Sequence, residues 1–135
     1  MLNVDEVLNL SQKELQKEVY EFLMNGGNNK KLAKIMSKTK GYCDKEELEV
    51  KKISFDKIER IAGPEKDMKY FEKEDLWNEK IDKMKDAIKK GWKPPPLIVW
   101  NKENKLTIAD GSHRIEALKK LEYNEYFCIV KKSKK

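Results

Sequence analysis

Two kinds of hydrophobic spacing divide the chain near residue 49. Before it, apolar residues recur every three or four positions, which is typical of amphipathic helices. After it, short apolar runs separated by glycine, proline and polar residues alternate with helical stripes, which is typical of strands and helices in one mixed domain. The pattern therefore predicts an N-terminal helical segment at 1–48 and an α+β domain at 49–130.

The first helix has a clear start signal. Residues 11–14, Ser-Gln-Lys-Glu, form a capping box, in which the Ser hydroxyl and the Glu carboxylate bond free backbone N–H groups at a helix start. The apolar stripe that follows consists of Leu15, Val19, Phe22 and Leu23. Asn-Gly-Gly-Asn at 25–28 ends this helix, and a second short helix is predicted to end at Gly41. The two helices form a predicted hairpin whose stripe docks on the core.

The elements predicted after residue 48 form a small mixed sheet with packed helices. In chain order they are a strand at 49–55, a loop from Gly63 to Phe71, an amphipathic helix through Trp77 that stops at Gly91, strands at 97–100 and 106–109, a helix from Ser112, and a strand at 126–130. The prolines at 94–96 cannot lie within a helix, because each fixes φ and lacks a backbone donor. Trp77 and Trp100 are predicted to lie in the core, and Trp92 is a candidate for a pocket wall.

Charge changes this picture only at the C-terminus. Hydrophobic residues make up 39% and charged residues 40% of the chain, and no stretch is apolar enough for a membrane span or a signal peptide. We therefore expect a soluble cytoplasmic protein without a membrane partner. The lysines at 131–135 supply four of the six net positive charges, which leaves +2 for the rest. This segment is predicted to be a basic disordered tail, and DNA is a less favoured partner.

Cysteine and histidine usage argues against one class of metal site. Cys43 and Cys128 stand far apart and form no C-x-x-C pair, and His113 is the single histidine of the chain. A zinc site is therefore not expected. The two thiols are interpreted as unreactive or buried.

The segment with the strongest chemical signal joins the strand at 106–109 to the next helix. It reads Asp110-Gly111-Ser112-His113-Arg114. Unpaired N–H groups at a helix start favour an anion, and a glycine there lets the backbone approach a ligand closely. Arginine can bind phosphate oxygens in a bidentate manner, and the serine and histidine side chains can donate further hydrogen bonds. The pattern predicts a phosphate site.

Two interpretations of Asp110 stay open. A carboxylate beside phosphate repels it unless a cation intervenes, so Asp110 has a catalytic or metal role if it holds Mg²⁺ or orients a reacting hydroxyl. Alternatively, it caps the helix start. His113 and Arg114 point more firmly to a ligand, because basic side chains at a helix N-terminus oppose the helix dipole.

The order of these elements resembles the ParB N-terminal and sulfiredoxin superfamily. The resemblance rests on the prolines and apolar run at 93–99, the segment 106–118 that contains the motif, and the strand at 126–130. It implies that fold over residues 49–130. Members include ParB partition proteins that bind and hydrolyse CTP, sulfiredoxins that use ATP, and free-serine kinases that use a nucleotide as phosphoryl donor. A nucleotide such as ATP, ADP or CTP is therefore implied at Gly111 to Arg114, with Mg²⁺.

Departures from the members' motifs narrow the choice. Sulfiredoxins place their reactive cysteine where this chain has Ser112, so repair of a sulfinic acid is not expected. ParB proteins usually carry a Gly-Glu-Arg-Arg type of motif and continue into a helix-turn-helix region, whereas this sequence ends at Lys135. The serine-kinase version, Asp-Gly-x-His-Arg, is more similar. That resemblance implies a catalytic glutamate in the loop after the first strand, and Glu65 is the best positional match.

Two classes of function follow from the resemblance. In the first, the protein is a nucleotide-dependent phosphotransferase or hydrolase, with Glu65 as general base toward a small hydroxyl-bearing substrate. In the second, it is a nucleotide-gated, CTP-type module that binds DNA or a protein without small-molecule catalysis. The nearby Glu72, Glu74 and Asp75 are interpreted as a solvated charge run. The base, the acceptor and the oligomeric state stay open.

Overall fold

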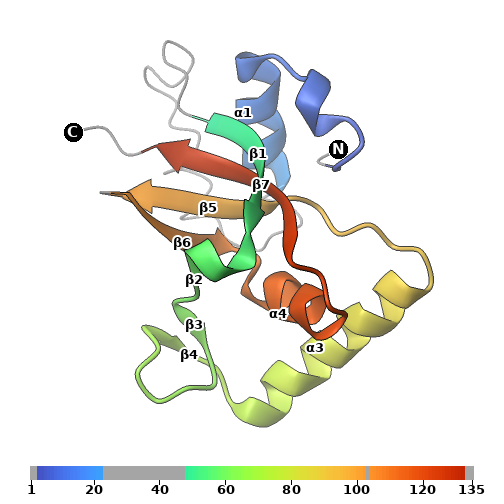
Figure 1. The fold of residues 1–135 in the computed structure, drawn as a ribbon, viewed down its shortest axis with the longest axis vertical. Helices are drawn as coiled ribbons and strands as arrows, with labels where there is room; N and C mark the ends of the chain where they lie inside the picture. Colours follow the sequence, from blue (N-terminus) through green and yellow to red (C-terminus); the bar gives the residue numbers. More distant parts are fainter. Residues whose placement is uncertain (1–2, 23–47, 103, 133–135) are drawn as a thin grey trace.

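The computed structural model describes residues 3–22, 48–102 and 104–132. Its main element is a five-stranded mixed sheet with the strand order β1-β7-β5-β6-β2 (Figure 1). These strands are β1 (Leu48–Ser54), β2 (Ile58–Glu59), β5 (Leu97–Lys102), β6 (Lys105–Asp110) and β7 (Glu125–Lys132). The β1–β7 and β5–β6 pairs are antiparallel, and the β5–β7 and β2–β6 pairs are parallel. The predicted α+β class with a mixed sheet is confirmed.

The remaining elements are helices and one small parallel strand pair. They are η1 (Val7–Asn9), α1 (Gln12–Glu21), η4 (Phe55–Lys57), β3 (Ala62–Gly63), β4 (Tyr70–Phe71), α3 (Glu74–Lys89) and α4 (Ser112–Lys120). The β3–β4 pair lies in the segment that the sequence predicts as a loop, and it leads directly into α3. The predicted starts of α1 and α4 and the predicted stop of α3 at Gly91 agree with the structure to within about two residues, whereas the predicted stop of the first helix at 25–28 lies outside the described residues.

Strand β5 is the centre of the fold because both of its faces are buried. Leu97, Ile98 and Val99 are all inaccessible to solvent. Side chains alternate between the two faces of a strand. Accordingly, Leu97 and Val99 pack into one core cluster, and Ile98 packs into another on the opposite face.

Helices cover both faces of the sheet. On one face, Val7, Leu15 and Val19 of the N-terminal helices pack with Ile98 and Ile129. On the other face, α4 packs through residues such as Ile115 and Leu118, and α3 packs on α4 (Figure 1). The contact between α3 and α4 contains Trp77, Ile81 and Ala117. The prediction that the first helix docks on the core is confirmed.

The start of α1 is tied both to itself and to the sheet. The predicted capping box is present, with Glu14 N–H donating to Ser11 Oγ and Ser11 N–H donating to Glu14 Oε1. The Gln12 side chain donates to the carbonyl of Leu48 and accepts from its N–H, both at 3.0 Å. The side-chain amide thereby makes the two hydrogen bonds to Leu48 of β1 that a neighbouring strand would make. The helix predicted to end at Gly41 lies outside the described residues, as does Cys43.

The structure corrects the predicted tail. A disordered segment was expected from residue 131, but β7 continues through Lys132, and Lys131 is buried. Lys131 aligns with Leu48 of β1 on one side and with Trp100 of β5 on the other. Backbone pairing with two neighbours outweighs the polar character of the sequence at this position.

The tryptophans differ in exposure. Trp77 is buried as predicted, Trp100 is partly buried against the core cluster that contains α1, and Trp92 is 40% exposed. No helix in the described part of the chain is long and apolar enough to cross a bilayer.

Candidate functional site

The turn from β6 into α4 depends on a glycine. Gly111 is the N-cap of α4 and has φ of 118°, a conformation that other residues rarely adopt. A Cβ at this position would lie 2.8 Å from Arg114 Nη2 and 3.0 Å from Leu97 Cδ2. The guanidinium of Arg114 is therefore packed directly against the glycine backbone.

The first turn of α4 presents unpaired donors. No side chain caps the helix start, so the interpretation of Asp110 as a helix cap is wrong. The first N–H groups of any helix lack intrahelical partners. In the described structure the Ser112 hydroxyl also makes no hydrogen bond, and the residue is only partly buried. This turn has the geometry expected of an anion site.

Asp110 and Arg114 form a largely buried ion pair across the turn, with the Asp110 side chain 18% exposed. Arg114 Nη2 donates to Asp110 Oδ2 at 3.1 Å and to the Asp110 carbonyl at 3.2 Å. The Arg114 side chain is 7% exposed, its Nε is buried without a hydrogen-bond partner, and its Cζ lies 5.3 Å from the centre of the Phe22 ring. Burial raises the pKa of Asp110, although the charge of Arg114 opposes this shift. Arg114 thus contributes positive charge beneath the turn, with one hydrogen-bond donor unused.

His113 is held by a carboxylate and an indole. Its Nε2 lies 2.5 Å from Oε1 of Glu72, a residue in the short segment that joins β4 to α3. Its ring centre is 4.6 Å from that of Trp77, at an interplanar angle of 41°. Glu72 is anchored in turn, because Lys80 Nζ donates to Glu72 Oε2 at 2.7 Å. Burial opposes ionisation of Glu72, but the hydrogen bonds from Lys80 and His113 outweigh it and lower the pKa of this carboxyl.

Arg60 joins the loop after β3 to α4. Two of its nitrogens donate to the Glu65 carboxylate, at 2.7 and 3.2 Å, and its Nε donates to Glu116 Oε2 at 3.0 Å. Its Cζ also lies 4.9 Å from the centre of the Trp77 ring. Through Trp77, this ion-pair cluster is continuous with His113. The structure therefore ties the Glu65 loop, through Arg60, to Glu116 in the middle of α4.

Glu65 is ionised and paired with Arg60, and it makes no hydrogen bond or ion pair with residues 110–114 in the described structure. The hydrogen bonds from Arg60 lower the pKa of Glu65, and its side chain is 45% exposed. A carboxylate with a lowered pKa is a weak proton acceptor. Activity of Glu65 as a general base therefore requires it to separate from Arg60.

The donors for a metal ion are few. Within the three described ranges, no group of three or more His, Cys, Asp or Glu side chains could hold a metal ion. Asp110 offers one carboxylate oxygen, Oδ1, that makes no hydrogen bond in the described structure. Mg²⁺ is commonly bound by one or two carboxylates together with substrate phosphates. Asp110 fits Mg²⁺ only when phosphates supply the other ligands.

Sequence reasoning missed Arg60 and misread Glu72. Glu72 was assigned to a solvated charge run, yet its side chain is 21% exposed and contacts His113, whereas Glu74 and Asp75 are exposed. One signal could have identified Arg60. The chain has 30 Lys and Arg residues, of which only Arg60 and Arg114 are arginines. Arginine suits bidentate and partly buried pairing better than lysine does.

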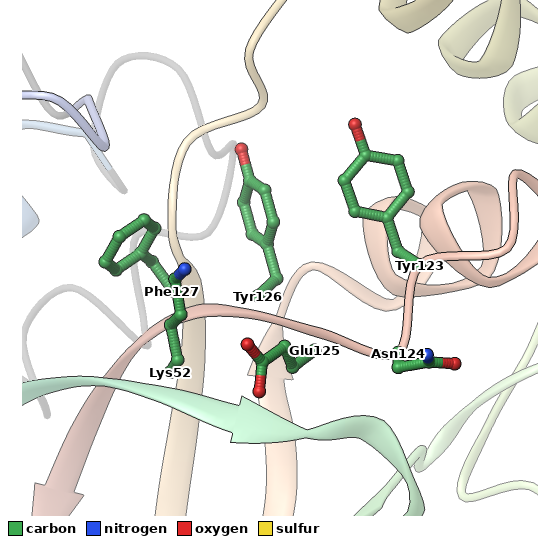
Figure 2. A pocket seen from close by; sticks show the side chains of 6 residues that line it. All are labelled: Lys52, Tyr123, Asn124, Glu125, Tyr126 and Phe127. Atoms are coloured by element: carbon green, nitrogen blue, oxygen red, sulfur yellow. The ribbon is translucent and has the colours of Figure 1, made fainter.

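A separate hollow lies between the end of α4 and strand β1. It has a volume of about 500 Å³ and is lined by Lys52, Tyr123, Asn124, Glu125, Tyr126 and Phe127 (Figure 2). Burial raises the pKa of Tyr126 to about 12, and its hydroxyl donates to the Pro94 carbonyl at 2.6 Å. None of the predicted site residues lines this hollow. Cys128, nearby in β7, is buried as expected, and burial raises the pKa of its thiol to about 12.

One comparison with known proteins identifies a family for most of the chain. A family model described as the ParB N-terminal domain matches residues 39–135. No curated protein matches the chain. Among solved structures, a Pnob8-like ParB-N domain is similar to this chain, with 17% sequence identity and a TM-score of 0.44. That match covers 64% of this chain and 30% of the other, so this chain matches less than a third of that protein.

The buried pair predicts a large stability effect. Arg114→Ala leaves the Asp110 carboxylate buried without its cation, so we expect a loss of about 3–5 kcal/mol in the free energy of unfolding, measured with urea. Lys120→Ala, at an exposed position on the same helix, is the matched control and should change it by less than about 0.5 kcal/mol. The double variant Asp110→Asn, Arg114→Met should recover part of the loss. An Arg114→Ala protein as stable as the control would contradict a structural role for the pair.

The contact between Arg60 and Glu65 predicts a change in titration. Arg60→Met should raise the pKa of Glu65 toward its ordinary range, which carboxyl ¹³C NMR during a pH titration measures. Because the pKa of Glu65 is lowered in the folded protein, the stability that this pair adds is present above the ordinary pKa and is lost as pH falls through the lowered one. Arg60→Met lacks the pair, so its free energy of unfolding should not show this decrease at acidic pH.

The matched control for this titration is Lys105→Met. Lys105 pairs with Glu59 at 3.6 Å and not with Glu65, so its removal should not change the pKa of Glu65. The assignment fails if Arg60→Met and Lys105→Met give the same Glu65 titration curve.

Proposed function

The chain belongs to the ParB N-terminal domain family, and on that premise we propose that it binds the phosphates of a nucleotide at the first turn of α4. The observation that carries the proposal is the uncapped start of α4 after a left-handed glycine, with a buried arginine directly beneath it. Free backbone donors and the helix dipole favour an anion at this point.

The charges at this turn support an anionic ligand. His113 and Arg114 lie in the first turn, where basic side chains oppose the helix dipole, and no acidic residue lies there. The buried Nε of Arg114 has no partner, so the guanidinium retains an unused donor. Each of these two side chains already has a carboxylate partner, Glu72 or Asp110, so the attraction for a phosphate comes from the free backbone N–H groups and the helix dipole. Ser112 would add a hydroxyl donor.

Mg²⁺ belongs to the proposal as a companion of the phosphates. Asp110 is the residue that would contribute an oxygen, and the ion would supply charge neutralisation between that carboxylate and the nucleotide. Arg114 already offsets part of the charge of Asp110. Asp110 would therefore pair with Arg114 in the folded protein and also bind Mg²⁺ when a nucleotide is present.

Catalysis is the next step of the proposal. The domain would act as a nucleotide-dependent phosphotransferase or hydrolase on a small hydroxyl-bearing substrate, with Glu65 as the base that accepts the hydroxyl proton. The support is proximity, because Arg60 joins the Glu65 loop to α4. Release of Glu65 from Arg60 would be required before it could accept a proton.

A second candidate function is a nucleotide-gated binding module. It is favoured by the pairing of Glu65 with Arg60 and of Glu72 with His113, because these contacts hold the segment 60–72 on α4. A nucleotide that competes for His113 would loosen this segment, and the surface presented to DNA or to a protein partner would change. In that case the function would be the change in the binding surface, and it would not require hydrolysis of the nucleotide.

Thermal stability provides the direct test of phosphate binding. A nucleotide that binds only the folded state should raise the melting temperature, with about 2.7 kcal/mol of added stability at a ligand concentration 100 times Kd. ATP, ADP, CTP and GTP are compared with and without Mg²⁺, and adenosine is the control without phosphate. The site is misplaced if no nucleotide at millimolar concentration shifts the melting curve.

Glu65→Gln separates the two functions. Glutamine preserves size but cannot accept a proton, so nucleotide affinity by calorimetry should persist while turnover of hydroxyl-bearing metabolites falls on the order of a hundredfold. The control is Glu79→Gln, at an exposed position on α3. Full turnover by Glu65→Gln would remove Glu65 as the base. Hydrolysis that depends on added DNA would instead support the gated module.

A further inference from the structure

His113, in the proposed phosphate site, is held by a residue far away in the sequence. Glu72 and His113 are 41 positions apart, and their contact at 2.5 Å joins the end of β4 to the first turn of α4. The side chains are 21% and 26% exposed, so the contact is partly shielded from water. An ion pair between fully exposed groups would add little.

Several contacts fix the Glu72 carboxylate in one orientation. Its Oε2 accepts from Lys80 at 2.7 Å, which leaves Oε1 to face the imidazole. The backbone N–H of Glu72 donates to the carbonyl of Gly63 at 2.9 Å, so the main chain is also anchored. Trp77 packs beside the imidazole ring on another side. These contacts together determine one ring orientation for His113.

The direction of the hydrogen bond follows from the charge of Glu72. An ionised carboxylate can only accept, so the hydrogen lies on Nε2 of His113. The other ring nitrogen, Nδ1, makes no hydrogen bond in the described part of the chain. A histidine with one nitrogen bound to a carboxylate and the other unused can direct the second nitrogen at a ligand.

We propose that Glu72 is a positioning residue for the phosphate site, because it holds His113 by Nε2 and leaves Nδ1 to contact a phosphate oxygen. This inference rests on the proposed function. A ring that carries hydrogen on both nitrogens would donate through Nδ1 to the phosphate and through Nε2 to Glu72, so it would lie between two anions. Glu72 therefore acts on the ligand through His113.

The first experiment needs no ligand. His113 is the only histidine, so its ring nitrogens give an unambiguous ¹⁵N NMR signal in the full chain. When the ring is neutral, we expect the Nε2–H tautomer in the natural protein and a mixture of tautomers in Glu72→Ala. Glu72→Gln, whose amide oxygen can still accept, should restore the Nε2–H form. An unchanged tautomer in Glu72→Ala would overturn the proposal.

The second experiment measures coupling, with inorganic pyrophosphate as the probe. Glu72→Ala should weaken its binding about tenfold, the size expected for loss of an orienting partner. The same substitution in a His113→Ala protein should not weaken binding further, because the residue through which Glu72 acts is absent. Glu79→Ala, at an exposed position on α3, is the matched control, and circular dichroism checks that each variant is folded.

The two experiments distinguish the failure of each proposal. Equal weakening by Glu72→Ala with and without His113 would refute the positioning role while leaving the phosphate site in place. If pyrophosphate and the nucleotides do not bind the natural protein, the proposed function fails, and so does the role of Glu72 at a ligand. The tautomer measurement then still reports whether Glu72 orients His113.

Discussion

The buried ion pair between Asp110 and Arg114 is the contact on which the candidate site depends. It spans the turn at Gly111, so it determines how the chain leaves β6 and enters α4. A buried charge without its partner is costly, and therefore neither residue can be displaced without the other. The close approach of the guanidinium also leaves no space for a side chain at position 111. One pair thus sets the backbone geometry that exposes the first donors of α4.

The orientation of α4 also affects the packing of the sheet and of α3, because both contact this helix. Ile115 and Leu118 pack on the sheet, while Ala117 meets α3 at Trp77. Trp77 then lies between the two polar groups that line the site, because it contacts both His113 and Arg60. The apolar contact between α3 and α4 and the polar contacts of His113 and Arg60 therefore share the Trp77 side chain. A shift of α3 would move both.

The same network would link nucleotide binding to conformational change in the gated module proposed as the second candidate function. Arg60, Glu65, Glu72 and His113 are each paired with a protein partner. In that module, a phosphate at the start of α4 would compete for some of these charges, and the segment 60–72 would respond. The chain uses lysine for nearly all its positive charge and places both of its arginines here. Planar guanidinium groups suit a network in which each cation meets more than one acceptor.

The sequence by itself determined the longer helices and strands of the described residues and the location of the turn at Gly111, but not the short strands β2, β3 and β4. Capping boxes, prolines, glycine stops and apolar spacing act over a few residues, so they could be interpreted without knowledge of the fold. Even the buried position of Trp77 followed from its place in a helical stripe. The end of β7 did not, because a lysine at 131 becomes buried only when strands on both sides extend that far. Only the tertiary structure decided that Arg114 faces Asp110, that Arg60 binds Glu65, and that Glu72 meets His113. Such contacts depend on how α3, α4 and the β3–β4 segment pack, and pairing between residues 41 positions apart leaves no periodic signal in the sequence.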